Sequence, residues 1–456
     1  MLLGRAKELK YLNTVYEKSG SQMIVVYGQR NVGKTALLNE FVEGKDAFYY
    51  TATPASTRQQ QFLLGNVIRE NQKNISEYPD FDEIFEVLQA DSAIGSKKIY
   101  IFDEWEHMIK ADTTLVDALI RLLRHAYSEN DAMIILCSSS IGFVENGLVS
   151  KIGRAALDIS GFLKVKELHF VDVIRRFPSL SMEECVKIYA VLGGIPGLWD
   201  CFDDGISVED NICRHILKNG CFLKEEGARF VKEELRETSV YYTILSALAQ
   251  GDQKLNDLYA HTGFSRAKIS VYLKNLMELE IVEKVFSVDT PGRDSQKKGI
   301  YRISNSYVHF WFRFIYPHYG DCLRLSPQDF YKKYIAAEMD SYCDEYFSII
   351  CREYMILSEG RDALPMKFEK TGLFVGKKGV IDFVGQSKDG KFVVAFCYYS
   401  KPMVTYEDYK NNLAVLGQAK IDADQVYLFV NGRFDEKLTL ESKVKGNVIL
   451  LGMDDL

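Results

Sequence analysis

Residues 23–41 read Met-Ile-Val-Val-Tyr-Gly-Gln-Arg-Asn-Val-Gly-Lys-Thr-Ala-Leu-Leu-Asn-Glu-Phe, and this stretch decides the fold of the first part of the chain. The apolar run over 23–27 predicts a buried strand, and the pattern from Lys34 onward predicts a helix. Between them, Gly28 to Thr35 has the spacing G-x-x-x-x-G-K-[ST]. A glycine loop placed between a strand and a helix is typical of a site for nucleotide phosphates.

The chemistry of such a loop explains its spacing. Gly28 and Gly33 allow successive backbone N–H groups to turn inward around the β-phosphate, and the helix that starts near Lys34 adds the positive end of its dipole. We expect Lys34 to reach the β- and γ-phosphates and the Thr35 hydroxyl to bind magnesium. A glycine turn with a surface lysine is the alternative, and it gives no role to the Lys-Thr pair. The intervening residues complete the predicted phosphate loop: Gln29, Arg30, Asn31 and Val32.

Two later strands support this interpretation. The apolar run over 98–103 ends in Asp103 and Glu104, a pair expected to hold magnesium and to activate the attacking water, respectively. Acidic residues are common at strand ends, but this pair follows a phosphate loop by about 70 residues. The run over 132–137 leads into three serines, of which Ser138 is the candidate for a contact beside the γ-phosphate. An ordinary serine loop is the alternative there.

Length and composition limit the class of protein. A chain of 456 residues is too long for one core, so two to four domains are expected. With 47% hydrophobic and 26% charged residues it has the composition of a folded globular protein, and its net charge of −7 gives no global attraction to nucleic acid. The nine cysteines include no C-x-x-C pair, which fits reduced thiols in the cytoplasm. Without a signal-like start or an 18-residue apolar stretch, we expect no membrane segment.

The patterns along the chain predict five regions. Alternating strands and helices over 1–160 indicate an α/β domain with a parallel sheet. Residues 161–225 are predicted to form a helical lid, interrupted by a Gly-Gly-Ile-Pro-Gly turn. The remaining regions are a winged helix over 226–305, an aromatic helical connector over 306–345, and a second α/β domain over 346–456. The connector is so rich in aromatic residues that a base-stacking platform is its alternative, but a buried helix is favoured.

The winged-helix prediction rests on three helical patterns followed by a strand. The third helix, from Arg266 to Leu279, would enter DNA if DNA is bound, with Arg266, Lys268 and Lys274 exposed. The predicted wing adds Arg293, Lys297 and Lys298. These charges could equally form a solvated face, so DNA and protein partners both stay open.

The motifs together resemble prokaryotic and archaeal ATPases of the AAA+ or STAND-like group that carry a winged helix and a C-terminal domain of the PD-(D/E)XK nuclease superfamily. The motifs that carry this resemblance are Gly4-Arg5 with Glu8-Leu9, Gly28 to Thr35, Phe102 to Trp105, Gly153-Arg154, Gly193 to Pro196, and Phe310 to Phe314. The resemblance implies ATP binding with Mg2+, with Gly4 and Arg5 near the adenine. It also implies that Arg154 is an arginine finger or sensor.

The C-terminal region departs from the nuclease pattern of these relatives. Active members end a strand in Glu-Ile-Asp and carry Glu-x-Lys on the next strand, whereas this chain has Val380-Ile381-Asp382 and then Phe396-Cys397-Tyr398. Asp382 alone cannot hold a catalytic metal, and only Glu353 could add a second carboxylate. We therefore expect a nuclease-like domain without nuclease activity.

The sequence thus predicts an ATP-binding and ATP-hydrolysing molecular switch. Nucleotide state would govern how the winged helix and the nuclease-like domain are presented to a partner. The alternatives are a DNA-binding regulator that uses ATP mainly as a ligand and, disfavoured, an ATP-gated nuclease. Self-association is expected only if Arg154 acts on a neighbouring copy.

Overall fold

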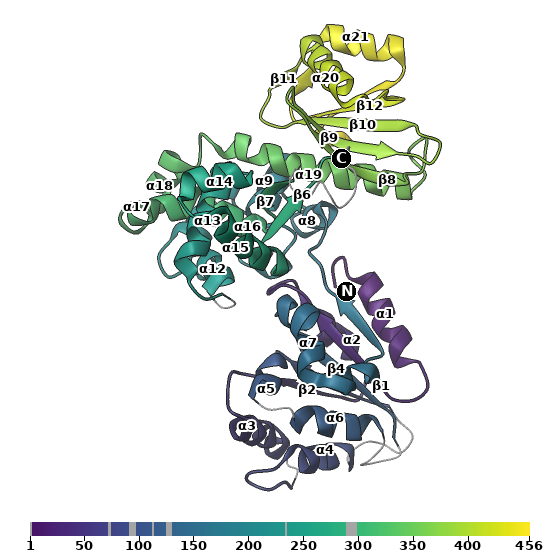
Figure 1. Ribbon diagram of the computed structural model, residues 1–456, viewed down its shortest axis with the longest axis vertical. Helices are drawn as coiled ribbons and strands as arrows, with labels where there is room; N and C mark the ends of the chain where they lie inside the picture. The colour runs from purple at the N-terminus through teal and green to yellow at the C-terminus, as the bar shows by residue number, and fades with distance from the viewer. Residues whose placement is uncertain are drawn as a thin grey trace. The chain divides into compact units, whose positions relative to one another are not determined.

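The computed structural model describes residues 2–71, 74–90, 97–111, 114–124, 130–232, 235–288 and 299–456. They form two compact units. The N-terminal unit comprises residues 1–168 together with 195–197, and the C-terminal unit comprises residues 169–194 and 198–456 (Figure 1). Three residues of the predicted Gly-Pro turn thus belong to the N-terminal unit, although the chain on both sides of them belongs to the other.

The N-terminal unit is built on a five-stranded parallel sheet of order β2-β3-β4-β1-β5. Its inner strands are mostly apolar and almost completely buried, so helices cover both faces and two hydrophobic cores form. The strands are β1 (Gln22–Tyr27), β2 (Ala47–Thr51), β3 (Lys98–Asp103), β4 (Ala132–Ser138) and β5 (Gly161–Lys164). The helices are α1 (Ala6–Tyr16), α2 (Lys34–Val42), α3 (Thr57–Glu70), α4 (Phe81–Ala90), α5 (Glu106–Ala111), α6 (Thr114–Leu123) and α7 (Leu148–Ile152).

The strand register brings the predicted site residues together at the carboxyl ends of the strands. Tyr27 at the end of β1 pairs with Ser138, and Asp103 at the end of β3 pairs with Cys137. In a parallel sheet all carboxyl ends lie at the same edge, which is where ligands usually bind. The strand order therefore gathers the phosphate loop, the acidic pair and the serine loop.

The chain after residue 160 differs from the prediction. The sequence suggested helices from 161 onward, but Gly161–Lys164 form the edge strand β5, and the N-terminal unit continues to Leu168. A strand of four residues that are all partly or largely exposed carries no detectable apolar alternation, which explains why the pattern missed it.

The C-terminal unit begins with a helical region. It contains α8 (Phe170–Arg176), α9 (Met182–Leu192), α10 (Pro196–Trp199, entered from the other unit), α11 (Val208–Asn211) with a π-helical continuation (Ile212–Leu217), and α12 (Phe222–Lys232). The winged helix follows as α13 (Thr238–Ala249), α14 (Leu255–Thr262), α15 (Arg266–Glu278) and the antiparallel pair β6 (Val282–Val285) and β7 (Ile300–Ile303). The residues Arg293, Lys297 and Lys298 of the predicted wing lie outside the described residues.

The aromatic segment is a buried helix rather than an exposed platform. It runs through α16 (Ser306–Phe310) and a π-helical turn (Trp311–Ile315), and the rings of Phe310, Trp311, Phe312 and Phe314 are buried. The Trp311 indole Nε1 donates to the Lys224 carbonyl at 2.9 Å. Base stacking needs exposed ring faces, so this segment packs the C-terminal unit instead.

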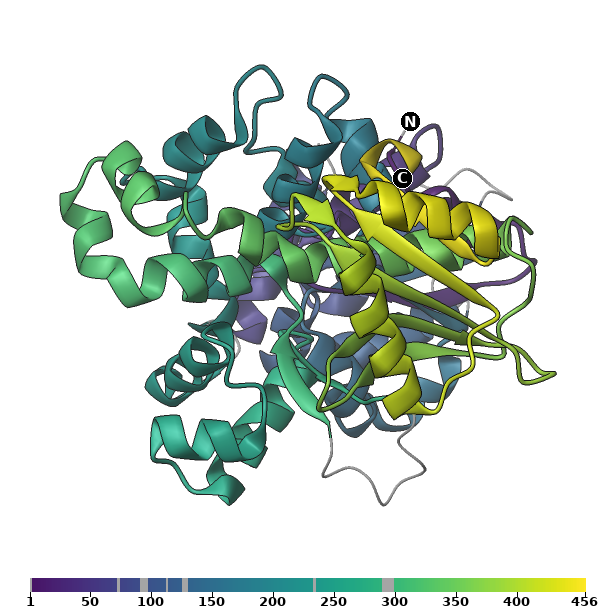
Figure 2. The same ribbon diagram turned by 90° about the horizontal axis from the view of Figure 1, so that it is seen from above.

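The end of the chain forms a second α/β layer structure. After α17 (Tyr319–Arg324), α18 (Pro327–Tyr334) and the long α19 (Met339–Gly360), a five-stranded sheet of order β14-β12-β10-β9-β8 follows. One face packs on α20 (Tyr406–Ala419), seen in front of the strands with α21 (Glu436–Lys445) in Figure 2. The strands are β8 (Lys370–Val375), β9 (Val380–Gln386), β10 (Phe392–Tyr398), β12 (Gln425–Val430) and β14 (Val448–Leu451), with a separate small pair β11 (Met403–Val404) and β13 (Arg433–Phe434).

Candidate functional site

The loop between β1 and α2 has a backbone that needs its glycines. Gly28 has φ +157 and Gly33 has φ +96, and a Cβ built at Gly28 would lie 2.2 Å from the Val165 carbonyl oxygen. Asn31 also has a positive φ of 62, a conformation that asparagine tolerates better than most residues. The loop therefore curls tightly over the start of α2, as the motif predicts.

Two basic side chains are buried against this loop. Lys34 is 5% exposed, and its Nζ donates to the carbonyl oxygens of Gly28 and Gln29, both at 3.0 Å. Arg5 is 3% exposed and donates to the Val32 carbonyl at 2.6 Å while pairing with Glu8 at 3.0 Å. The family resemblance implies a place for Arg5 near the adenine, which stays a prediction; in the structure its guanidinium holds the phosphate loop at the Val32 carbonyl.

Asp103 is the centre of a hydrogen-bond network at the carboxyl edge of the sheet. Its Oδ2 accepts from the Thr35 hydroxyl at 3.0 Å and from the Tyr49 hydroxyl at 2.7 Å, and its Oδ1 accepts from the Glu104 N–H at 3.0 Å. Burial and the Asp103 carboxylate raise the pKa of Tyr49, so its hydroxyl stays protonated and donates. The sequence placed Thr35 and Asp103 together but missed Tyr49, because a tyrosine in an apolar strand gives no signal of its own.

Glu104 follows directly in an unusual conformation. Its φ is +52, the left-handed region that costs a non-glycine residue on the order of 1 kcal/mol. Its Oε1 accepts from the Ser139 hydroxyl at 2.5 Å. The serine that contacts Glu104 is therefore Ser139, whereas Ser138 is buried and its hydroxyl accepts the Ser140 N–H at 3.1 Å. Ser138 is the last residue of β4, and only the residue after it is free of the strand.

Glu106 and His107 lie next to Glu104 and form a cluster with it, which the sequence did not predict. Glu106 is 3% exposed, and ligand atoms of Glu104, Glu106 and His107 all lie within 4.8 Å of one another. Burial and the neighbouring Glu104 carboxylate raise the pKa of Glu106 to about 8. The sequence Glu-Trp-Glu-His was visible, but its grouping depends on the turn after Asp103.

The remaining N-terminal predictions are placed as follows. Arg154 is exposed in a short 3₁₀ helix, Gly153–Asp158, and Gly4 is exposed with φ +67.

The phosphate loop is also contacted by a segment far along the chain: the Gly197 N–H donates to the Asn31 carbonyl at 3.0 Å. A Cβ on Gly197 would lie 2.9 Å from that same oxygen, and one on Gly33 would lie 3.3 Å from Pro196 Cγ. The Pro196-Gly197 pair thus packs directly on the phosphate loop.

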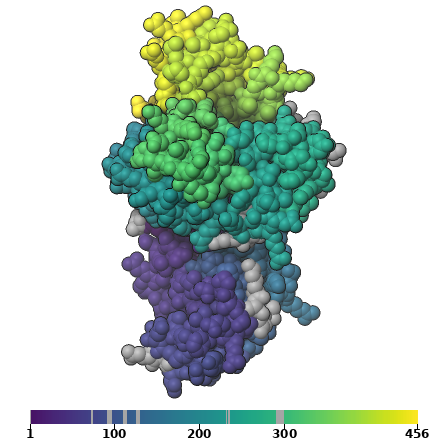
Figure 3. Space-filling view, turned by 90° about the vertical axis from the view of Figure 1, so that its left-hand side faces the viewer, coloured from purple at the N-terminus to yellow at the C-terminus, as the bar shows by residue number. Residues whose placement is uncertain are grey.

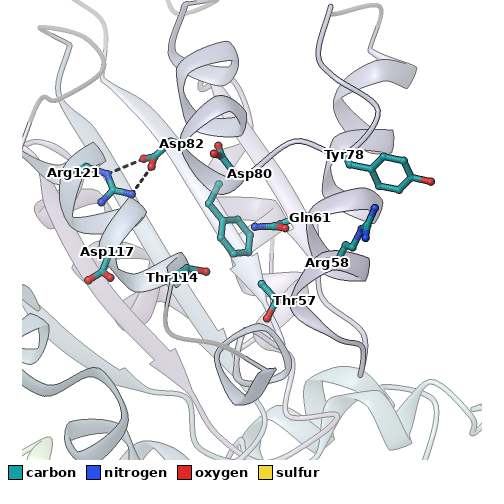
Figure 4. A pocket seen from close by; sticks show the side chains of 10 residues that line it. Thr57, Arg58, Gln61, Tyr78, Asp80, Asp82, Thr114, Asp117 and Arg121 are labelled. Atoms are coloured by element: carbon teal, nitrogen blue, oxygen red, sulfur yellow. Dashed lines mark hydrogen bonds and ion pairs between the residues drawn. The ribbon is translucent and has the colours of Figure 1, made fainter.

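A separate open cavity of about 730 Å³ lies between α3, α4 and α6. In Figure 4, Arg121 forms its ion pair with Asp82 on one side, and Arg58 lies near Tyr78 on the other. Its charges are mixed, and none of its ten described lining residues belongs to the nucleotide motifs. The cavity is therefore a surface feature distinct from the phosphate loop.

In the C-terminal α/β region, Asp382 is enclosed by protein groups. Its carboxylate accepts from the Ser348 hydroxyl at 2.7 Å and from the Cys397 N–H at 2.9 Å, and burial raises its pKa. The Glu353 carboxylate points to other partners, accepting from the Phe170 N–H at 3.0 Å and the Tyr189 hydroxyl at 3.1 Å. Within the described ranges, no cluster of three metal-ligating residues includes either carboxylate.

The winged helix presents a mixed surface along α15. Ile269, Leu273 and Leu276 face the core, which leaves the opposite side of the helix exposed. The winged-helix residues form part of the teal surface in Figure 3. Arg266 stacks on Tyr259 at 4.2 Å, and Lys274 lies 3.6 Å from Glu278. Ala267, Ser270 and Val271 form the small-residue centre of this exposed side.

These features define the class of the N-terminal unit: it has an α/β P-loop NTPase-like fold. Residues 2–199 match a family described as an ATPase domain predominantly from Archaea. Residues 242–284 match bacterial regulatory proteins of the arsR family, which supports the winged helix, and residues 311–411 match archaeal and bacterial proteins of unknown function.

Individual relatives extend the comparison. An uncharacterized protein of Methanocaldococcus jannaschii is 26% identical over the full length of both chains. An uncharacterized ATP-binding protein of the same organism is 38% identical over 45 residues, which cover 10% of this chain and 76% of that protein. Among solved structures, a Walker-type ATPase of Pyrococcus abyssi has 18% identity and a TM-score of 0.47, covering 68% of this chain and 96% of its own. Among the described residues, no helix is long and apolar enough to cross a bilayer.

Proposed function

We propose that this chain is an ATP-hydrolysing molecular switch that couples its nucleotide state to the winged helix and the C-terminal α/β domain. One observation carries the proposal: Thr35 Oγ1 and Asp103 Oδ2 lie 3.0 Å apart at the mouth of the glycine loop. Two hard oxygen donors at this spacing suit Mg2+, and the loop backbone with Lys34 suits a triphosphate. The residues present therefore fit Mg-ATP.

Each residue then has a defined task. The loop N–H groups from Gln29 to Gly33 and the Lys34 ammonium hold the phosphates, while Thr35 and Asp103 hold the cation, which would neutralise phosphate charge. Tyr49 fixes Asp103 by its hydrogen bond, and Arg5 fixes the loop. Ser138, Gly4 and Arg154 remain proposed contacts to the nucleotide, Arg154 from the same or a neighbouring copy.

Glu104 is the proposed base for the attacking water. Its φ of +52 breaks the strand conformation directly after Asp103, and the Ser139 hydroxyl donates to one carboxylate oxygen. A carboxylate held by a single hydroxyl keeps the other oxygen available to orient water and accept its proton.

One connection between the phosphate loop and the C-terminal unit runs through residues 195–197. These residues contact the phosphate loop at Asn31 and lead directly into Trp199, whose indole Nε1 donates to the Gly193 carbonyl at 2.8 Å. A change in the loop on nucleotide binding would therefore act on the base of the proposed helical lid. This short path supports a switch rather than a passive nucleotide store.

A DNA-binding regulator is the second candidate function, favoured by the arsR-family match and by the basic residues of α15. ATP turnover measured with and without duplex DNA separates the two. Stimulation by DNA at low salt supports a DNA-coupled switch, whereas unchanged turnover assigns the winged helix to a protein partner.

If DNA binds, the double variant Arg266→Ala/Lys274→Ala should weaken it at every sequence. It should also lower the slope of log affinity against log salt by roughly two, because two phosphate contacts no longer release counterions. Electrophoretic titration at several salt concentrations measures both. The control Lys388→Ala/Lys443→Ala removes the same charge from exposed sites on the C-terminal α/β domain and should change neither.

We also propose that this C-terminal domain is nuclease-like in fold and cuts no DNA, since Asp382 and Glu353 are committed to different partners. Supercoiled plasmid incubated with the protein, Mg2+ or Mn2+, and ATP should stay intact. Cleavage that disappears in an Asp382→Ala variant would show a surviving active site and contradict the proposal.

A further inference from the structure

Glu104, Glu106 and His107 bring two carboxylates and an imidazole together beside the nucleotide site. The His107 N–H donates to the Glu104 carbonyl at 3.0 Å, and Glu104 has its φ of +52, so the chain makes a turn that gathers the three side chains. Their ligand atoms lie within 4.8 Å of one another. Within the described residues, this is the only group of three such side chains at that spacing.

A second, independent observation concerns Glu106. The residue is 3% exposed, and its Oε2 has no hydrogen-bond partner. A buried carboxylate oxygen without a partner is costly, since it has lost water and gained nothing in return. The same Glu106 carboxylate contributes an oxygen to the group with Glu104 and His107, so a cation held by all three residues would supply the missing interaction.

We propose that Glu104, Glu106 and His107 bind one divalent transition-metal cation, of the manganese or zinc class, at a site separate from the Mg2+ of the nucleotide. Imidazole with carboxylates favours such ions over Mg2+ or Ca2+, which prefer oxygen ligands alone. Ligand atoms about 2.0–2.2 Å from one ion can be at most roughly 4.4 Å apart, so only small side-chain movements are needed. Water would complete the coordination.

The site has a consequence that rests on the proposed function. Glu104 is the proposed base, and a carboxylate held by a transition metal can no longer take a proton from water. Thr35, Asp103 and Lys34 are not part of the group, so nucleotide binding would continue. The cation would thus act as an inhibitor of turnover that leaves ATP affinity unchanged.

The test measures cation binding without any nucleotide, so it is independent of ATPase activity. The full chain, stripped with a chelator and desalted, is titrated with Mn2+ while free Mn2+ is followed by electron paramagnetic resonance. Mn2+ is chosen because thiols bind it weakly, which limits interference from the nine cysteines. We expect one tight site, and at least a tenfold weaker affinity in both Glu106→Gln and His107→Ala.

Two controls sharpen the result. His261→Ala removes a histidine that pairs with a single carboxylate, Asp252, at 2.5 Å, and should leave Mn2+ binding unchanged. Thr35→Ala removes a ligand of the nucleotide's cation and should also leave it unchanged. Circular dichroism checks that each variant is folded. If the buried Glu106→Gln variant does not fold, the Mn2+ affinity of His107→Ala alone tests the proposal.

Three outcomes would overturn the proposal. The first is Mn2+ binding that is unaffected by both cluster variants. The second is binding lost in Thr35→Ala but kept in the cluster variants, which would assign it to the nucleotide's cation site. The third is no tight Mn2+ binding by the native chain, which would mean that the Glu106 carboxyl stays neutral by holding its proton. Absence of ATP turnover in the native chain without added Mn2+ would contradict the proposed function but not this site, because the cation is bound without nucleotide.

Discussion

Lys34→Ala should reduce ATP affinity by on the order of 100-fold or more while the chain stays folded. The ammonium donates to the Gly28 and Gln29 carbonyls at 3.0 Å each, so it is held where bound phosphates would take over these bonds. Hydrogen bonds to charged groups contribute about 1.5–3 kcal/mol each, and about 1.4 kcal/mol is tenfold in affinity. Loss of two such bonds therefore gives roughly this factor.

Equilibrium binding of a fluorescent ATP analogue with Mg2+ measures the effect, and thermal unfolding monitors the fold. Lys45→Ala is the matched control, because Lys45 follows the other end of the same helix, near the Phe41 carbonyl, and lies outside the phosphate loop. That variant should bind ATP normally. Native affinity in Lys34→Ala would show that the loop does not hold the phosphates.

Glu104→Gln should lower ATP turnover by about 100-fold or more with little change in ATP affinity. General-base catalysis contributes roughly 10²–10⁴-fold, and an amide cannot accept the proton of water. The amide oxygen can still accept from the Ser139 hydroxyl, which lies 2.5 Å from Glu104, so the local structure should persist. Steady-state phosphate release and a binding titration together separate the catalytic effect from a binding effect.

Glu40→Gln offers the comparison, since Glu40 lies on α2 away from the acidic pair and should leave turnover at the native rate. Equal turnover in Glu104→Gln and the native chain would place the base elsewhere. A parallel loss of affinity would indicate instead that Glu104 supports the fold of the loop.

Local chemistry allowed much of the site to be predicted. The glycine spacing from Gly28 to Gly33 requires positive φ values and a close approach to Val165, and both are present. The apolar strands before the loop and before Asp103 are continuous, so their burial on both faces followed from composition alone. The winged helix was predictable for a similar reason: buried positions 269, 273 and 276 recur at helical spacing.

Other features could be predicted only in part because they depend on pairs of residues far apart in the sequence. The four-residue strand β5 is defined by pairing with β1, since its own side chains show no period. Glu353 could have been a metal ligand by residue type, but the chain brings it to Phe170 and Tyr189 instead. The contact between Ser139 and Glu104 likewise depends on where β4 ends, whereas the predicted contact of Ser138 with the γ-phosphate stays a prediction.

The sequence by itself was enough to predict that a P-loop core comes first and that a winged helix follows, and to name the residues proposed to carry the phosphate and cation chemistry. It could do so because each motif is short, contiguous and tied to one local backbone shape. Only the tertiary structure decided that Tyr49 supports Asp103, that residues 195–197 pack on the phosphate loop, and that Glu106 and His107 join Glu104. These contacts depend on the order of the strands, on residues 195–197 packing with the N-terminal unit, and on the left-handed backbone of Glu104, none of which a local sequence pattern specifies.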